Sequence, residues 1–300
     1  MSWRIILITQ ACKLSTKNNQ LIYLNEETQE ELKVPLEDIA SIILDTKQVH
    51  ISGYLMSELA ENGITILTTN NSHIPNGVFM PYMQYYKNFE TSILQSEWTE
   101  PFKKRLWQKI IQQKIKNHAY VIKPYNYEVY KHLIELSKKV LSGDEKNIEG
   151  VAAKRYFEVF YQDFVRGKPS KVNSALDYGY SIVRSLLAKN ISAMGFMPCF
   201  GVHHCNKFNA FNLIDDMIEP FRAFVDYKVK NLFPVDSDNT DLTKEERQEL
   251  ISNMFYEVEY DGKKYSILYI TQLVAENLLL ITKEKDTKHL ILPSFSDNLF

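Results

Sequence analysis

The sequence predicts an α+β protein, in which a small β-rich N-terminal domain precedes a larger, mainly α-helical domain. Early in the 300-residue chain, short runs of apolar and β-branched residues alternate with turns rich in Asn and Ser. From about Ser92 onward, apolar residues instead recur every three to four positions, which is the helical period. We therefore expect the β-rich domain to span 1–85, a linker to span 86–91 and the helical domain to span 92–300.

The predicted strands are short runs that combine β-branched, aromatic and aliphatic residues. They are 3–8, 20–24, 31–36, 39–44, 64–68 and 78–82. One helix interrupts them, because Leu55 and Leu59 fall on one helical face and Gly63 is a helix-ending residue.

In the helical part, the apolar period predicts a series of helices and one hairpin. The helices lie around 102–111, 129–136, 151–165, 173–194, 244–254 and beyond 267. We expect Pro124 to open the second helix, Gly195 to end the fourth, and a capping box at 243–246 to precede the fifth. The pair Asp261-Gly262 between two β-like runs predicts a hairpin with a primed turn.

The composition excludes several classes of protein. Apolar residues make up 45% of the chain, which excludes a disordered or low-complexity protein. The three cysteines form no Cys-x-x-Cys pair and are too few for a disulfide framework or a zinc ribbon. No apolar stretch reaches the roughly 20 residues needed to cross a bilayer, and the first residues do not resemble a signal peptide. We expect a cytoplasmic protein without a membrane segment.

The net charge of −2, from 35 basic and 37 acidic residues, hides an uneven distribution. The segment 101–140 holds ten basic and two acidic residues, a local charge of +8, so the rest of the chain carries −10. Aromatic residues are interleaved with these positive charges, a pattern typical of binding to a nucleic-acid backbone. A solvated helix face above core aromatics would give the same pattern. The acidic segment 236–249 is expected to be an exposed loop and helix start.

Three separated places in the helical part carry residues able to do chemistry. Glu149 stands at the expected start of a helix, where the helix dipole favours a carboxylate. His203 and His204 follow a glycine and a valine in a polar loop. Asp216 and Glu219 are three residues apart and would share one face if this segment is helical. Because the following proline has no N–H to donate, a helix here is expected to be kinked or to begin nearby.

Each of these residues also has an ordinary structural interpretation. Glu149 could be a first-turn glutamate, and Arg222 is correctly spaced to pair with Glu219. Taken together, one imidazole among carboxylates suits Mg²⁺ or Mn²⁺ better than structural zinc. Such an ion can polarise a phosphodiester and activate a hydroxyl nucleophile, so we expect phosphoryl transfer on nucleic acid.

The order of these motifs resembles the CRISPR-associated integrase family, the Cas-one (Cas1) subunit of the spacer-acquisition complex. The matching stretches are Glu149-Gly-Val-Ala-Ala-Lys-Arg-Tyr-Phe, Val172-Asn-Ser-Ala-Leu-Asp-Tyr-Gly179-Tyr180, Gly201-Val-His-His204 and Asp216-Met-Ile-Glu219-Pro-Phe-Arg222. The Met-Ser-Trp-Arg start and the length look like the type II branch. The resemblance covers nearly the whole chain, and the order of the four motifs is specific.

This resemblance implies a metal-dependent DNA endonuclease and integrase whose helical domain is catalytic. A 3′-hydroxyl of a short duplex, the protospacer, would attack a phosphodiester at the border of the CRISPR repeat. Carried over by position, Glu149, His204 and Glu219 bind the Mg²⁺ or Mn²⁺ ion, and Asp216 is the assisting acid, so all four are catalytic. His203 is then only the neighbour. Many members have aspartate at the position of Glu219, and the longer side chain leaves the placement of the ion open.

The resemblance also implies partners. It implies a homodimer formed through the β-rich domain, with two dimers flanking a dimer of a small ferredoxin-like companion, Cas-two (Cas2), in a heterohexamer. Double-stranded DNA is the substrate, and other type II CRISPR proteins are further candidate partners. The candidate DNA-binding residues are Lys103, Lys104, Arg105, Lys109 and Arg222.

Two other functions remain open from the sequence. The chain could be a non-catalytic DNA-binding scaffold of the same machinery that uses its basic helix at 103–116. It could also be a metallohydrolase of small phosphoesters, although it has neither a dinuclear His/Asp-rich motif nor a P-loop.

Overall fold

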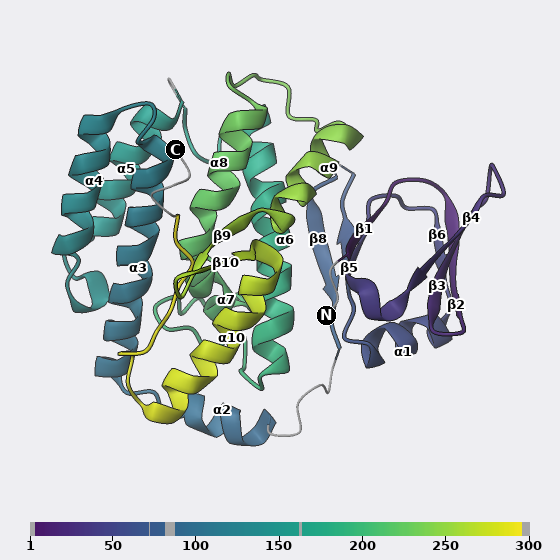
Figure 1. The fold of residues 1–300 in the computed structure, drawn as a ribbon, viewed down its shortest axis with the longest axis horizontal. Coiled ribbons are helices and arrows are strands. Elements are labelled where there is room, and N and C mark those ends of the chain that lie inside the picture. The colour runs from purple at the N-terminus through teal and green to yellow at the C-terminus, as the bar shows by residue number, and fades with distance from the viewer. Residues whose placement is uncertain (1–3, 72, 82–87, 162–163, 296–300) are drawn as a thin grey trace.

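A computed structural model describes residues 4–71, 73–81, 88–161 and 164–295. It shows a β-rich N-terminal domain beside a larger helical domain (Figure 1), which confirms the predicted fold class. Within these residues, no helix is both long enough and apolar enough to cross a membrane.

Two four-stranded sheets build the N-terminal domain. The first has the order β1 (Arg4–Ile8), β5 (Ile39–Leu44), β7 (Thr65–Thr69) and β8 (Pro75–Phe79), in which only β8 is antiparallel to its neighbour. The second has the order β4 (Glu31–Pro35), β3 (Gln20–Asn25), β2 (Cys12–Lys17) and β6 (Val49–Ile51). Leu55 and Leu59 of α1 (Gly53–Glu61) join Leu14 and Ile42 of the sheets in one buried core.

Five predicted strands lie within one or two residues of observed ones, but the prediction at 78–82 is shifted from β8. Residues 3 and 82 of the predicted strands lie outside the described part. The prediction missed β2 and β6. In β2, buried Cys12 and Leu14 flank exposed Lys13, but the polar end of the strand hides this alternation. The three residues of β6 are too few to show a period.

The helical domain is built around two long helices, α3 (Glu100–Ile122) and α6 (Lys171–Ala193). The other elements are α2 (Asn88–Ser96), α4 (Tyr127–Lys139), α5 (Ile148–Phe160), α7 (Asn212–Met217), α8 (Arg222–Leu232), α9 (Lys244–Ser252), β9 (Glu257–Tyr260), β10 (Lys263–Ser266) and α10 (Ile267–Glu284). Helix α6 is the long helix of this domain that lies next to the N-terminal sheet, where it contacts β7 and β8 (Figure 1). Ile43 and Leu67 of that sheet are part of the helical domain's core.

The structure confirms some of the local features predicted for the helical part and contradicts others. The capping box at Thr243 and the Asp261-Gly262 hairpin are confirmed. The prediction that Pro124 opens a helix is wrong, because the side chain of Asn126 caps α4 and Pro124 lies in the preceding turn. In the predicted linker, 86 and 87 lie outside the described residues, whereas 88–91 form the first turn of α2.

The acidic segment 236–249 contains the predicted loop and helix start, and it also attaches to α6. The carboxylate of Asp236 accepts a hydrogen bond from the N–H of Val172 at 2.9 Å, in the first turn of α6. Nζ of Lys171 lies 2.7 Å from a carboxylate oxygen of Glu246. Part of the segment's negative charge therefore holds the domain together.

Candidate active site

Glu149 lies in the first turn of α5, as predicted. The buried carboxylate of Asp144 accepts hydrogen bonds from the backbone N–H groups of Ile148 and Glu149, both at 2.9 Å. The side chain of Asn147 caps the same turn. These bonds satisfy N–H groups that a helix start leaves unpaired, and they fix the backbone from which Glu149 projects.

Asp216 of α7 holds the loop that carries His204. Asp216 is fully buried, and its carboxylate accepts hydrogen bonds from the backbone N–H groups of Val202 at 2.5 Å, His203 at 3.0 Å and His204 at 3.1 Å. It also bonds Nδ1 of His204 at 2.6 Å, which raises the pKa of this histidine although burial opposes the shift. The ring is therefore oriented with Nε2 facing away from Asp216.

Gly201 allows this loop to close on Asp216. A Cβ at this position would lie 2.2 Å from the carbonyl oxygen of His204 and 2.9 Å from Oδ2 of Asp216, so any side chain would push the loop away. Steric crowding thus explains why a glycine stands at the first position of the Gly-x-x-His motif. The ring of His203 stacks face to face on Trp107 with the ring centroids 4.3 Å apart, whereas the ring of His204 meets Trp107 edge-on.

Glu219 opens a short 3₁₀ turn, Glu219–Phe221, directly after α7. Helix α7 ends at Met217 and α8 begins at Arg222, so a helix begins close to Pro220, as predicted. Glu219 contacts a different set of partners from Asp216. Nε of Arg222 donates to Oε1 of Glu219 at 2.9 Å, which confirms the predicted pairing. Burial alone would raise the pKa of Glu219, but the positive charges of Lys114 and Arg222 outweigh it and lower this pKa to about 2.

Lys114 of α3 joins Glu149 to Glu219. Its Nζ lies 2.5 Å from Oε1 of Glu149 and 2.5 Å from Oε2 of Glu219. Burial alone would lower the pKa of Lys114, but the two carboxylates outweigh it and raise this pKa. The structure therefore brings the first and last predicted carboxylates together around one ammonium group.

Two adjoining cavities open beside these residues. Glu219 lines the first, of about 490 Å³, and His204 lines the second, of about 500 Å³. Arg166 and Arg222 line both cavities, and Arg184 lines the second. The predicted glutamate and histidine thus face neighbouring spaces whose shared walls carry guanidinium groups.

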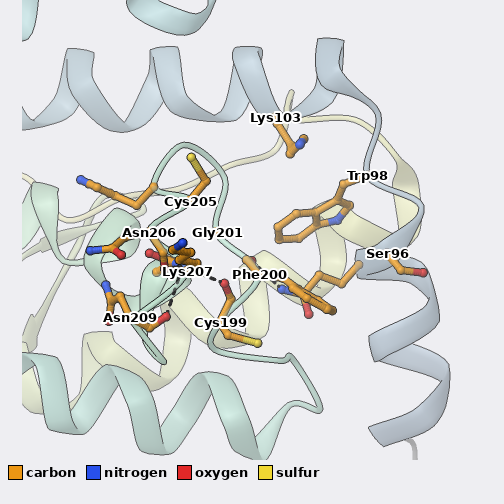
Figure 2. Close-up of a pocket in the computed structure, with 13 residues that line it drawn as sticks. Ser96, Trp98, Lys103, Cys199, Phe200, Gly201, Cys205, Asn206, Lys207 and Asn209 are labelled. Atoms are coloured by element: carbon orange, nitrogen blue, oxygen red, sulfur yellow. Dashed lines mark hydrogen bonds between the residues drawn. The ribbon is translucent and has the colours of Figure 1, made fainter.

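His204 also lines a third cavity, of about 560 Å³. Trp98, Phe200 and Lys103 surround part of this cavity, and Lys207 comes from the loop that carries His204 (Figure 2). Aromatic rings beside lysines are typical of surfaces that hold single-stranded nucleic acid by stacking and by charge.

The basic residues of α3 that were predicted to bind DNA have varied surroundings. Lys103 and Lys104 form ion pairs with nearby glutamates. Nζ of Lys109 donates to backbone carbonyls at 287–288. Arg105 is exposed. Because several of these positive charges are paired or bonded within the protein, the local sum of +8 overstates the positive charge available to a ligand.

The sequence prediction placed Lys114 only within the basic segment and missed its position between the two glutamates. The helical period of α3 did indicate that Lys114 faces inward. The residues three and four positions away share its helical face and are all buried: Ile110, Ile111, Asn117 and His118. Arg166 and Arg184 were also missed, because nothing in their local sequence distinguishes them from surface arginines.

The residues present fit a hard divalent cation. Two carboxylates and one imidazole are ligands that Mg²⁺ and Mn²⁺ accept. Oε2 of Glu219 is buried and, apart from its ion pair with Lys114, makes no hydrogen bond within the described structure. In the described ranges, no three His, Cys, Asp or Glu side chains already form a metal-binding group. Lys114 occupies the space between the two glutamates, so an ion would need to take its place.

A β-rich domain joined to a helical domain that gathers carboxylates, an imidazole and arginines at adjoining cavities defines an enzyme of phosphoryl transfer. A family model described as CRISPR associated protein Cas1 matches residues 5–253. The chain is 36% identical over 295 residues to the CRISPR-associated endonuclease Cas1 of Neisseria meningitidis serogroup C (strain 8013), covering 98% of this chain and 96% of the relative. The chain therefore belongs to the Cas1 family, which confirms the resemblance.

Solved structures show the same fold. One described as a casposase bound to integration product has a TM-score of 0.77 at 17% identity, covering 100% of this chain and 94% of the other. One described as a Cas6-RT-Cas1–Cas2 complex has a TM-score of 0.74 at 17% identity, covering 100% of this chain and 36% of the other.

Proposed function

We propose that this chain catalyses metal-dependent insertion of short duplex DNA into a CRISPR array. As a member of the Cas1 family, the chain is an enzyme of CRISPR adaptation. The observation that carries the proposal is the meeting of Glu149 and Glu219 around one cation, beside the cavity that His204 faces. A non-catalytic scaffold gives no reason for two carboxylates and an ammonium group to meet at a largely buried point, because taking charges out of water is costly.

In this proposal, Glu149, Glu219 and Nε2 of His204 hold the Mg²⁺ or Mn²⁺ ion. When bound, the ion supplies positive charge that polarises the phosphodiester and favours the hydroxyl nucleophile. Asp216 acts through His204, because its bond to Nδ1 sets the direction of the ring. Arg222 holds Glu219 from the opposite oxygen.

The reaction exchanges one phosphodiester for another. The 3′-hydroxyl of the incoming DNA loses its proton and forms the new P–O bond, while the leaving 3′-oxygen of the repeat gains a proton. Because bonds of the same kind form and break, no nucleotide cofactor is needed. In this proposal, the guanidinium groups of Arg166, Arg184 and Arg222, each of which also pairs with a carboxylate, contact phosphates on either side of the reacting one. Trp98 and Phe200 line the neighbouring cavity, and in this proposal their rings stack on bases of the strand end.

We further propose that the chain acts on double-stranded DNA as a homodimer, with two dimers flanking a Cas2 dimer. The description of one structure with this fold as a Cas1–Cas2 complex supports the companion. The heterohexamer is the expected stoichiometry, and analytical ultracentrifugation of the two purified proteins with and without DNA would measure it.

The proposed function is tested by replacing the three ligands one at a time. Strand transfer is measured with purified chain, Cas2 companion, DNA and a titration of Mg²⁺ or Mn²⁺. We expect Glu149→Gln, His204→Ala and Glu219→Gln each to lower the rate roughly 100-fold or more, while unfolding stays cooperative. His203→Ala is the matched control and should retain most activity, because His203 stacks on Trp107. Wild-type rates in all three ligand variants would contradict the proposal. An equal loss of rate in His203→Ala would show that His204 is the wrong choice of metal-binding histidine.

A further inference from the structure

We propose that Lys114 is a built-in cation that takes the place of the metal in the metal-free protein and must move before the metal binds. The inference rests on the proposed function, since it takes Glu149 and Glu219 as ligands. It adds a residue of α3 that competes with the ion for the same carboxylates and so sets the affinity of the site.

The distances place ammonium and metal in the same space. Nζ of Lys114 lies 2.5 Å from one oxygen of Glu149 and 2.5 Å from one oxygen of Glu219, so these two oxygens are at most about 5 Å apart. A Mg²⁺ ion held by both carboxylates would lie about 2.1 Å from each ligating oxygen, so those oxygens would stand at most about 4 Å apart. A small closing movement of the glutamates would suit the ion, but only after the ammonium has left.

Both oxygens of Glu219 already face a cation. Oε2 is buried behind Lys114, and Oε1 accepts from Nε of Arg222 at 2.9 Å. An ion that binds Oε2 of Glu219 together with Glu149 must therefore displace Lys114. Arg222 is anchored a second time, because its guanidinium lies 4.7 Å from the ring centroid of Tyr180, whose hydroxyl bonds Asp226.

Lys114 is the cation better able to move. Among the described residues, its ammonium pairs only with Glu149 and Glu219. It sits on a flexible four-carbon stem, and its side chain lines the cavity of about 490 Å³. The ammonium can therefore leave the carboxylates and remain in a polar cavity.

Charge balance points the same way. Two carboxylates, Lys114 and Arg222 form a group with no net charge. Adding a divalent ion would leave +2 at a point where the side chain of Glu219 is only 6% exposed, and uncompensated buried charge is costly. If the ammonium withdraws, the sum falls to +1, and the phosphodiester of a bound DNA brings it to zero. Lys114 thus keeps the metal-free site neutral. After its ammonium withdraws, the ion and the DNA phosphodiester together restore neutrality.

The test measures metal binding rather than activity. Full-length protein is treated with EDTA and titrated with Mn²⁺ alone by isothermal titration calorimetry, as wild type, Lys114→Met and Lys116→Met. Lys116 is exposed on the same helix, so its replacement removes the same charge away from the glutamates. We expect Lys114→Met to bind Mn²⁺ at least tenfold more tightly than wild type, and Lys116→Met to bind within twofold of it. Equal or weaker binding by Lys114→Met would overturn the inference.

Two further measurements support the titration. In EDTA, Lys114→Met should melt below wild type, and Mn²⁺ should raise its melting temperature more than that of wild type. If Lys114→Met does not fold, chemical labelling of the wild-type protein tests the inference instead. A short pulse of an amine-acetylating reagent, read by mass spectrometry, should label Lys114 several-fold more with Mn²⁺ than without it and leave Lys116 unchanged. Unchanged labelling of Lys114 under conditions where Mn²⁺ binds would overturn the inference.

A double variant separates this inference from the proposed function. Glu149→Gln with Glu219→Gln should lose the Mn²⁺ site. If it binds Mn²⁺ as wild type does, or if wild type binds none, the proposed ligands are wrong and both proposals fail. If the double variant loses the ion while Lys114→Met gains no affinity, the role of Lys114 alone fails.

Discussion

Asp216 holds the loop that carries His204 in place. It holds three backbone N–H groups and one ring nitrogen of the loop at 202–204, and it is fully buried. If this carboxylate were absent, several polar groups would lose their partner away from water, which costs more than the bonds themselves contribute. Asp216 is therefore a positioning residue whose loss affects fold and activity together.

Asp216→Ala should lower the free energy of unfolding by about 3 kcal/mol and strand transfer at least roughly 10-fold. Urea denaturation and the reconstituted integration assay measure the two effects. His204→Ala is the control, because the side chain of His204 is 45% exposed and its loss should remove activity with little change in stability. If Asp216→Ala unfolds like wild type, or if His204→Ala is equally destabilised, Asp216 does not position the loop as described.

The sequence predicted the partners of single residues where those residues lie close together in the chain. Asp216 and Glu219 were found because two acids three apart, before a proline, need partners, and Arg222 was found as one of them. Lys114 was not found, because its role depends on α3 packing against α5 and against the 3₁₀ turn, segments far apart in the chain. A charge count treats every lysine as surface, whereas the helical period identifies one that faces inward.

At the scale of elements, α3 has two different faces. Its inner face carries Lys114 to the glutamates, and its outer face carries Arg105 and Lys116, both exposed. The sequence predicted the helix and its charge because both are local properties. It did not predict which charges are paired, because the acids that pair with them come partly from other segments, as Glu145 does for Lys104.

Reversing the outer charges tests whether this face meets DNA. Arg105→Glu with Lys116→Glu should weaken duplex binding roughly tenfold and flatten the plot of log affinity against log salt by up to about two units, one for each lost phosphate contact. Fluorescence anisotropy over a range of salt concentrations measures both. The same charge change on β2, Lys13→Glu with Lys17→Glu, is the control, because both lysines are exposed in the N-terminal domain. A similar loss in both pairs would mean that net charge, not this face, controls binding.

At the scale of the whole molecule, the two domains are packed as one body. Ile43 and Leu67 of the N-terminal sheet lie in the helical core, and Nε of Arg247 on α9 lies 2.6 Å from Oδ2 of Asp45 just after β5. Both groups of this ion pair are buried. The sequence predicted the two domains from their different periods, but neither period reports how one domain packs on the other.

Lys189 makes the domain contact sensitive to pH. Its Nζ, on α6, donates to the carbonyl of Ala40 in β5 at 2.9 Å, beside a cavity of about 650 Å³ that both domains line. Burial lowers the pKa of Lys189 to about 8 from its ordinary 10.5. The unfolded chain therefore binds this proton more tightly than the folded one, and stability rises with pH wherever that difference applies.

Below pH 8, both states carry the proton, and folding bears the full cost of burying the charge, about 3 kcal/mol. Between pH 8 and 10.5, this cost falls to zero as the folded protein releases the proton. Lys189→Met should therefore unfold with about 2 kcal/mol more free energy than wild type at pH 7, after allowing about 1 kcal/mol for the lost bond to Ala40. This advantage should shrink steadily above pH 8. Urea denaturation from pH 7 to 10 measures it, with exposed Lys154→Met as the control, because all other groups titrate alike in the three proteins. An advantage that stays constant with pH would show that the ammonium of Lys189 is not the group that strains the domain contact.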